Sequence, residues 1–129
     1  MSLNYISKNI KGMYDVGAIS QDASKATEFY ARLGFKRDHQ KEGLTVFVVG
    51  NVELAIRKEI PNSEMGPLVA TVLGSVSFGV IVEDIKIIAK RLETQGIHFV
   101  GPKPFHVRFT GIETKDPDGN IVRLFQEEQ

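Results

Sequence analysis

A chain of 129 residues, 42% apolar and 25% charged, fits one soluble globular domain with a single hydrophobic core. Sixteen basic side chains balance sixteen acidic ones, so net charge attracts neither nucleic acid nor an anionic membrane. The absence of cysteine excludes disulfides, zinc–thiolate sites and thiol nucleophiles, and no apolar run is long enough to cross a bilayer. We therefore expect a cytoplasmic protein with neither nucleic-acid nor membrane partners.

The first half of the chain predicts a strand, a helix and three further strands. The apolar run 16–20 predicts a buried strand, and Asp22 after it is a typical helix N-cap. Apolar residues then recur on one helical face until Gly34, which favours the left-handed conformation that ends a helix. Further strands are expected from Phe35 onward and over 44–49 and 52–56, the last two joined by a tight turn.

The second half repeats this order. Asp84 predicts the start of a second helix and Gly96 its end, and strands are expected over 76–82, 97–100, 109–115 and 121–125. Asp22 and Asp84 lie 62 residues apart, as do Gly34 and Gly96. Two caps at one offset indicate an internal duplication. The single domain at 1–129 then consists of module one at about 13–58, a linker at 59–75 and module two at about 76–127.

Two motifs connect this duplication to a known family. The segment 22–30 (DASKATEFY) with the following Leu-Gly-Phe, and the turn 116–120 (DPDGN) before an apolar strand, resemble the two module signatures of the vicinal oxygen chelate superfamily. That superfamily contains glyoxalases, bleomycin resistance proteins and extradiol dioxygenases. The resemblance covers about residues 13–127 and implies an α+β fold. In it, two tandem β-α-β-β-β modules form a curved mixed-sheet cup, with the helices outside and the ligand site inside.

The resemblance also implies where relatives hold a divalent metal. The first-strand positions, seven residues before each capping aspartate, are Asp15 and Ser77, and the last-strand position of the second module is Arg123. In the first module the register leaves Glu53 and Ala55 as alternatives. Arginine has no lone pair to give and serine is a weak ligand, so we expect no bound metal and no other cofactor.

The same residues support a different hypothesis. If the fold brings them together, the Arg123 guanidinium can pair with Asp15 or Glu53, or it can hold a ligand carboxylate or phosphate. An ion pair with a purely structural role is the alternative. Strand alternation also directs Arg57 into the cup.

Two classes of function remain open. The first is a metal-free protein that binds a small molecule in the cup and uses an exposed aromatic side chain, Phe47 or Phe109. The second is a lyase or isomerase that resembles lactoylglutathione lyase or a dioxygenase; without a metal it needs Asp15 or Glu53 as general base. A module whose cup is filled by its own side chains is a third possibility. The resemblance also implies a homodimer.

Overall fold

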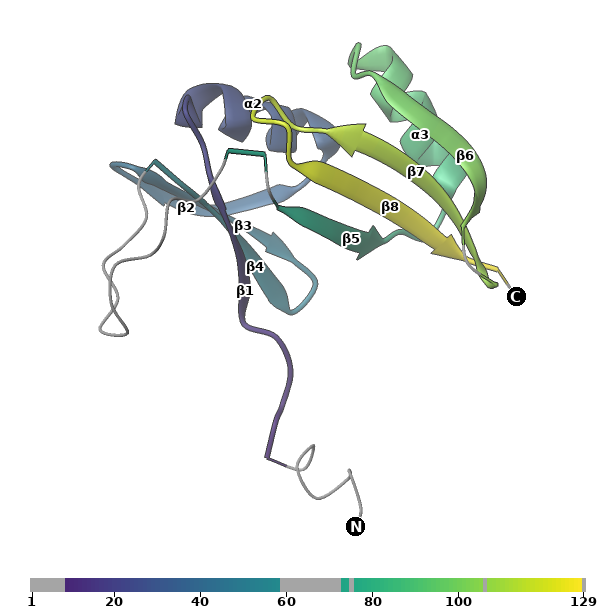
Figure 1. Ribbon diagram of the computed structural model, residues 1–129, viewed down its shortest axis with the longest axis horizontal. Coiled ribbons are helices and arrows are strands. Elements are labelled where there is room, and N and C mark those ends of the chain that lie inside the picture. Colours follow the sequence, from purple (N-terminus) through teal and green to yellow (C-terminus); the bar gives the residue numbers. More distant parts are fainter. Residues whose placement is uncertain (1–8, 59–72, 75, 106, 129) are drawn as a thin grey trace.

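The computed structural model describes residues 9–58, 73–74, 76–105 and 107–128, which form two four-stranded sheets, each with one helix (Figure 1). The first module contains β1 (Asp15–Ile19), α2 (Ala23–Leu33), β2 (Lys36–Lys41), β3 (Leu44–Val49) and β4 (Val52–Arg57). The second contains β5 (Ser77–Ile81), α3 (Ile85–Thr94), β6 (Phe99–Phe105), β7 (Phe109–Lys115) and β8 (Ile121–Glu127). Most of the expected linker, 59–72 and 75, lies outside the described residues.

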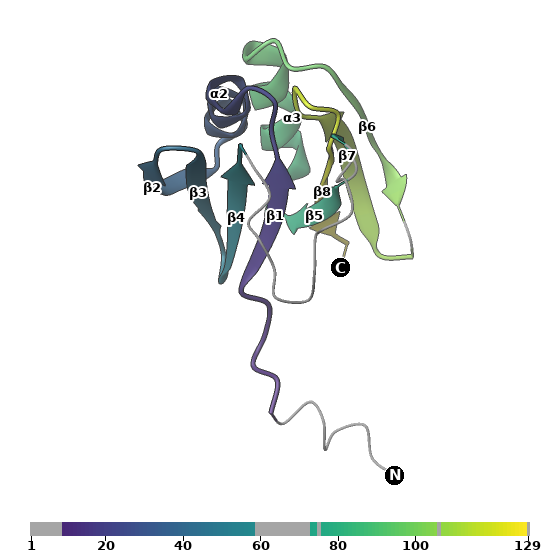
Figure 2. The ribbon, with the colours of Figure 1, turned by 60° about the vertical axis from the view of Figure 1, so that its left-hand side comes forward.

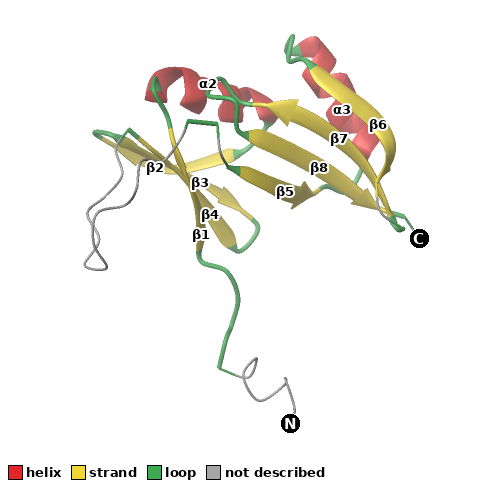
Figure 3. Cartoon of the chain, viewed as in Figure 1, coloured by secondary structure: helices red, strands yellow, loops and turns green. Residues whose placement is uncertain are grey.

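The two modules share one topology, which confirms the predicted α+β fold of two β-α-β-β-β units. The strand orders are β1-β4-β3-β2 and β5-β8-β7-β6. In each module the first strand runs parallel to the last one, and the remaining neighbours are antiparallel. Figure 3 shows both helices on the same side of the molecule, above the two sheets.

The helix boundaries follow from the predicted caps. A side-chain oxygen of Asp22 accepts a hydrogen bond from the backbone N–H of Lys25 at 3.2 Å, and Asp84 accepts one from Lys86 at 2.9 Å. Gly34 ends α2 with a φ of 109°, a conformation that costs glycine little. With 11 and 10 residues, the described helices are too short to span a bilayer.

The hydrophobic core lies between the two sheets and beneath both helices. Tyr30 of α2 is fully buried at its centre, where its ring packs edge-on against Phe29 at a centroid distance of 5.1 Å. The same ring lies 6.4 Å from Phe78, which belongs to the second sheet. One continuous cluster of buried residues therefore includes both modules, and the helix-covered faces of the two sheets turn toward each other (Figure 2).

Strand β6 is longer than the sequence predicts. The expected strand covers 97–100, whereas β6 continues to Phe105 and its register shifts between Val100 and Lys103. This stretch contains Pro102 and Pro104, which lack a backbone N–H. An edge strand tolerates proline, and β6 lies at the edge of its sheet.

Candidate functional site

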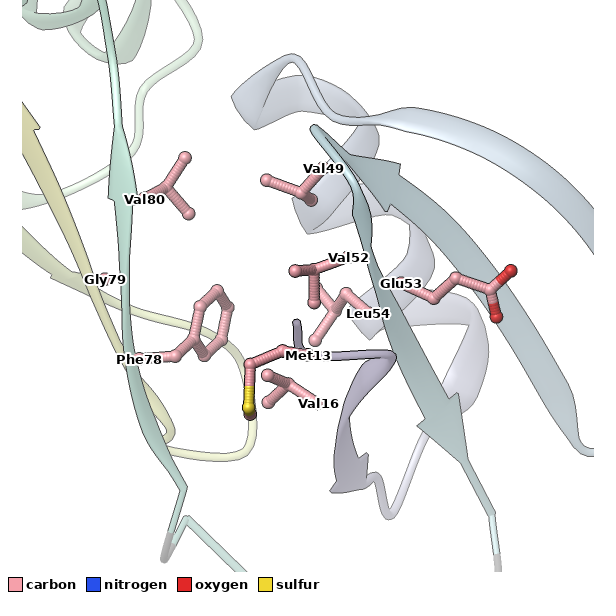
Figure 4. Close-up of a pocket in the computed structure, with 9 residues that line it drawn as sticks. All are labelled: Met13, Val16, Val49, Val52, Glu53, Leu54, Phe78, Gly79 and Val80. Atoms are coloured by element: carbon pink, nitrogen blue, oxygen red, sulfur yellow. The ribbon is translucent and has the colours of Figure 1, made fainter. Parts of the chain in front are cut away.

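Each sheet has a second face that turns away from the core, and the predicted site residues lie on these two open faces. Asp15 of β1 and Glu53 of β4 stand opposite each other in the β1–β4 register. Figure 4 shows Glu53 pointing away from the space between the sheets, toward which Leu54 points. Side chains alternate along a strand, so Asp15 shares the open face of Glu53.

The register shows which of Glu53 and Ala55 corresponds to Arg123 of the second module. Gly79 of β5 pairs with Arg123, and Gly17, which lies 62 residues earlier, pairs with Ala55. Ala55 is therefore the first-module counterpart of Arg123. Glu53 lies two residues before it on the same face. Hairpin turns in the two modules differ in length, which is why counting along the sequence leaves this choice open.

The four equivalent positions are Asp15, Ala55, Ser77 and Arg123. They offer one carboxylate, one methyl group, one hydroxyl and one guanidinium, a set that does not fit a divalent metal ion. Within the described ranges no three histidine, cysteine or acidic side chains come close enough to hold one.

Arg123 is held in place by residues of its own sheet. Its Nη1 donates to Ser77 Oγ at 2.7 Å, and its Nε donates to Glu113 Oε2 at 3.1 Å. The guanidinium carbon lies 5.7 Å from the centre of the Phe105 ring, within the range of a cation–π contact. Asp15 and Glu53, the partners expected from sequence, lie on the other sheet of the chain.

Glu113 is a site residue that sequence reasoning missed. It stands opposite Arg123 in the antiparallel register of β7 and β8. The turn at 116–120 fixes this register, because it pairs Lys115 with Ile121. Counting outward from that turn would have found the pair.

Glu53 has a neighbour that sequence reasoning also missed. The Tyr14 hydroxyl contacts its carboxylate, and the negative charge of Glu53 raises the pKa of the exposed Tyr14 above its usual value. The backbone reinforces this contact, since the N–H of Glu53 donates to the carbonyl of Tyr14 at 2.8 Å. Arg57 lies farther along the same open face, opposite Ile19 in the register.

Of the two candidate aromatic residues, Phe47 is not available to a ligand. Its side chain is fully buried on the core face, 5.8 Å from the Tyr30 ring. Both faces of β3 are apolar, so alternation alone could not identify which one is covered. Phe109 lies on the open face of the second sheet, where its ring is 5.7 Å from Phe125. Phe105, which pairs with Phe109 in the register of β6 and β7, has its ring 5.0 Å from Phe125.

A cleft of about 280 Å³ opens between the two sheets on their core side (Figure 4). Valine, leucine, methionine and phenylalanine side chains face it, among them Val49, Val52, Phe78 and Val80. Glu53 is one of its lining residues, but its carboxylate points the other way. Among the described residues this cleft therefore offers mainly apolar surface, and the charged side chains of the candidate site lie on the open faces.

Comparison with known proteins places this geometry in a family. No curated protein matches the sequence. Among solved structures, an antibiotic-binding protein from Streptomyces superposes with a TM-score of 0.75 and 23% identity, covering 92% of this chain and 98% of that one. A bleomycin-binding protein in complex with bleomycin superposes with a TM-score of 0.68 and 20% identity, covering 92% of this chain and 99% of that one.

A lactoylglutathione lyase from Agrobacterium tumefaciens gives a TM-score of 0.74 at 18% identity, covering 90% of this chain and 93% of that one. At such identities these structures show a common fold. The sequence itself matches the family model of the Glyoxalase/Bleomycin resistance protein/Dioxygenase superfamily over residues 13–124. The match spans most of the chain and both modules, and the chain therefore belongs to this superfamily.

Proposed function

We propose that this protein binds a small molecule without a metal ion, in a cup that two copies of the chain build together. The observation that carries the proposal is the position of Arg123. At a position where the family resemblance implies a metal ligand, this chain has a cation that Glu113 and Ser77 fix by hydrogen bonds of 3.1 and 2.7 Å. A guanidinium oriented in this way loses little freedom when it binds a ligand oxygen.

Two copies are needed because the open faces of one chain look away from each other. The core faces turn inward, so Asp15 and Glu53 cannot close over Arg123 of the same chain. A second copy that sets its first sheet against this second sheet would enclose a ligand. It would also bring an acidic pair toward Arg123 and Lys103.

Exposed apolar side chains favour the same arrangement. Ile81 is 65% exposed and Val100 is 49% exposed, and their register partners place both on the open face of the second sheet. Apolar groups gathered beside charged ones on an exposed sheet face are typical of an interaction surface. Two of the similar structures, whose names describe them as binding an antibiotic or bleomycin, are consistent with a binding role.

The competing proposal is a lyase or dioxygenase-type enzyme, and metal content separates the two. Protein purified without chelator is expected to contain less than one equivalent of metal. Nickel, zinc, manganese and iron(II) are expected to leave its melting temperature unchanged, because Ala55 and Arg123 supply no ligands. A metal at 100 times its dissociation constant would stabilise the fold by about 2.7 kcal/mol. Elemental analysis showing stoichiometric metal, together with such a shift, would make the enzyme the better proposal.

Replacing Arg123 with leucine tests the binding role directly. A thermal-shift screen of small oxygen-containing molecules first identifies the compound that binds best. The variant is expected to bind this compound about 10- to 100-fold more weakly, because it loses a charge-assisted hydrogen bond. Arg37→Leu is the control, since Arg37 lies on the exposed edge strand β2 and donates to Gln40. Light scattering on the same samples is expected to give twice the 14.3 kDa chain mass. A monomer that binds with unchanged affinity when Arg123 is lost contradicts the proposal.

A further inference from the structure

The open face of the second sheet carries an aromatic surface that needs two glycines. A Cβ atom added to Gly79 would lie 2.7 Å from Cε2 of Phe125, and one added to Gly111 would lie 3.0 Å from its Cδ1 and Cε1. A Cβ contact of 2.7 Å is essentially never seen and one of 3.0 Å is unusually tight, so the Phe125 ring occupies the space above both glycines. The ring therefore spans β8, with β5 on one side and β7 on the other.

Two more rings extend this surface. Phe105 and Phe109 lie 5.0 and 5.7 Å from Phe125, and all three side chains are half-buried. We call these three residues the aromatic floor. Arg123 stands at its end, 5.7 Å above the Phe105 ring. Three partly exposed rings next to a fixed hydrogen-bond donor form a surface on which a flat ring can stack while one of its substituents reaches the guanidinium.

We infer that the aromatic floor selects a planar aromatic ligand that carries an oxygen acceptor for Arg123. The inference rests on the proposed binding function and adds the class of ligand. Glu113, at 3.1 Å, offsets much of the charge of Arg123. The ring system of the ligand, rather than its net charge, then decides which molecules bind, so neutral ketones and carboxylates both qualify.

The internal duplication allows the same strand position to be compared in the two modules. Gly17 is the first-module counterpart of Gly79, and nothing lies within 4 Å of a Cβ built on it. In that module the register puts Arg57 at the position of Phe125. Within the described parts of the two sheets, only the second module therefore has an aromatic floor. Alanine at Gly79 therefore displaces an aromatic ring, whereas alanine at Gly17 has no ring to displace.

Calorimetric titration of the full-length protein with three probes tests the inference. The probes are 2-naphthoate, 2-acetylnaphthalene and the saturated decahydro-2-naphthoate. Both naphthalenes are expected to bind about 3- to 10-fold more tightly than the saturated acid, because aromatic pairing contributes about 0.5–1.5 kcal/mol. Gly79→Ala displaces the Phe125 ring and is expected to weaken naphthalene binding about 3- to 10-fold. Arg37→Leu, which changes an exposed side chain on the edge strand β2, is the control and is expected to leave naphthalene binding unchanged.

Phe125→Leu provides a second variant that keeps the glycines. It is expected to weaken binding of the two naphthalenes and to leave binding of the saturated acid unchanged. If the saturated acid binds as tightly as 2-naphthoate, the aromatic class is wrong, although binding in the cup stands. If the naphthalenes fail to bind while a non-aromatic compound from the screen binds through Arg123, the inference is likewise overturned. Failure of the binding function itself has a different signature, namely a screen ligand whose affinity does not depend on Arg123.

Discussion

Replacing Asp116 with alanine is expected to lower the free energy of unfolding by about 4 kcal/mol, because several buried groups depend on its carboxylate. The side chain is only 5% exposed, and it accepts hydrogen bonds from the Tyr30 hydroxyl at 2.7 Å and the Asn120 amide at 2.8 Å. It also accepts the backbone N–H groups of Asp118 and Asn120, at 3.0 and 2.9 Å. Alanine at this position leaves the Tyr30 hydroxyl and the Asn120 side-chain amide without an acceptor, and each unsatisfied buried donor costs about 1–3 kcal/mol.

Urea unfolding followed by circular dichroism measures this loss. Asp84→Ala is the matched control, because Asp84 is an exposed aspartate that caps α3 and whose removal is expected to cost about 1 kcal/mol. A double variant with Tyr30→Phe isolates the contribution of the Tyr30–Asp116 hydrogen bond to stability. Because the two residues are in contact, the double variant is expected to lose less stability than the two single variants together. Equal losses for the two aspartate variants would mean that the buried network contributes little.

The bond between Tyr30 and Asp116 joins the two modules. Tyr30 belongs to α2 of the first module, and Asp116 opens the turn between β7 and β8 of the second. Nearby, the N–H of Gln21 donates to Asp118 at 2.9 Å, and Arg91 Nε donates to the carbonyl of Arg32 at 2.9 Å. These links hold the core faces together, and they thereby keep both open faces turned outward.

The local parts of this fold could be predicted from the sequence because their causes are local. Asp22 and Asp84 cap helices by accepting hydrogen bonds from residues two or three positions ahead. The strand bounds at 44–49 and 109–115 also match, since flanking glycine or polar turns mark them. The offset of 62 residues between the caps then led to the duplicated topology without knowledge of any contact.

The site could be predicted less well, because it depends on which strands pair and in which register. A shift of two residues along β4 exchanges Glu53 for Ala55, and the sequence alone does not fix the length of the first hairpin. The pair of Arg123 with Glu113 follows from the turn at 116–120, but the position of Asp15 relative to Arg123 depends on how the modules pack. Sequence reasoning placed Asp15 nearby, whereas the inward-turned cores leave Glu113, on the neighbouring strand, as the residue in contact.

Alkaline pH is expected to destabilise the fold through Tyr30. Burial, and then the negative charge of Asp116, raise the pKa of the Tyr30 hydroxyl well above its ordinary value. In the unfolded chain this hydroxyl ionises near pH 10, as an exposed tyrosine does. The contribution of Tyr30 to stability is therefore complete below about pH 10. Above that pH the unfolded state binds fewer protons than the folded state, and stability falls by about 1.4 kcal/mol per pH unit.

Urea unfolding at intervals from pH 8 to pH 12 measures this slope in the wild type and in Tyr30→Phe. The variant is expected to be less stable at pH 8, because it loses the bond to Asp116, and to lose less stability above pH 10. Tyr14→Phe is the control: Tyr14 is 72% exposed, so this variant is expected to keep most of the wild-type slope. Identical slopes for the wild type and Tyr30→Phe would show that Tyr30 ionises freely in the folded protein. The buried bond that joins the two modules would then be absent in solution.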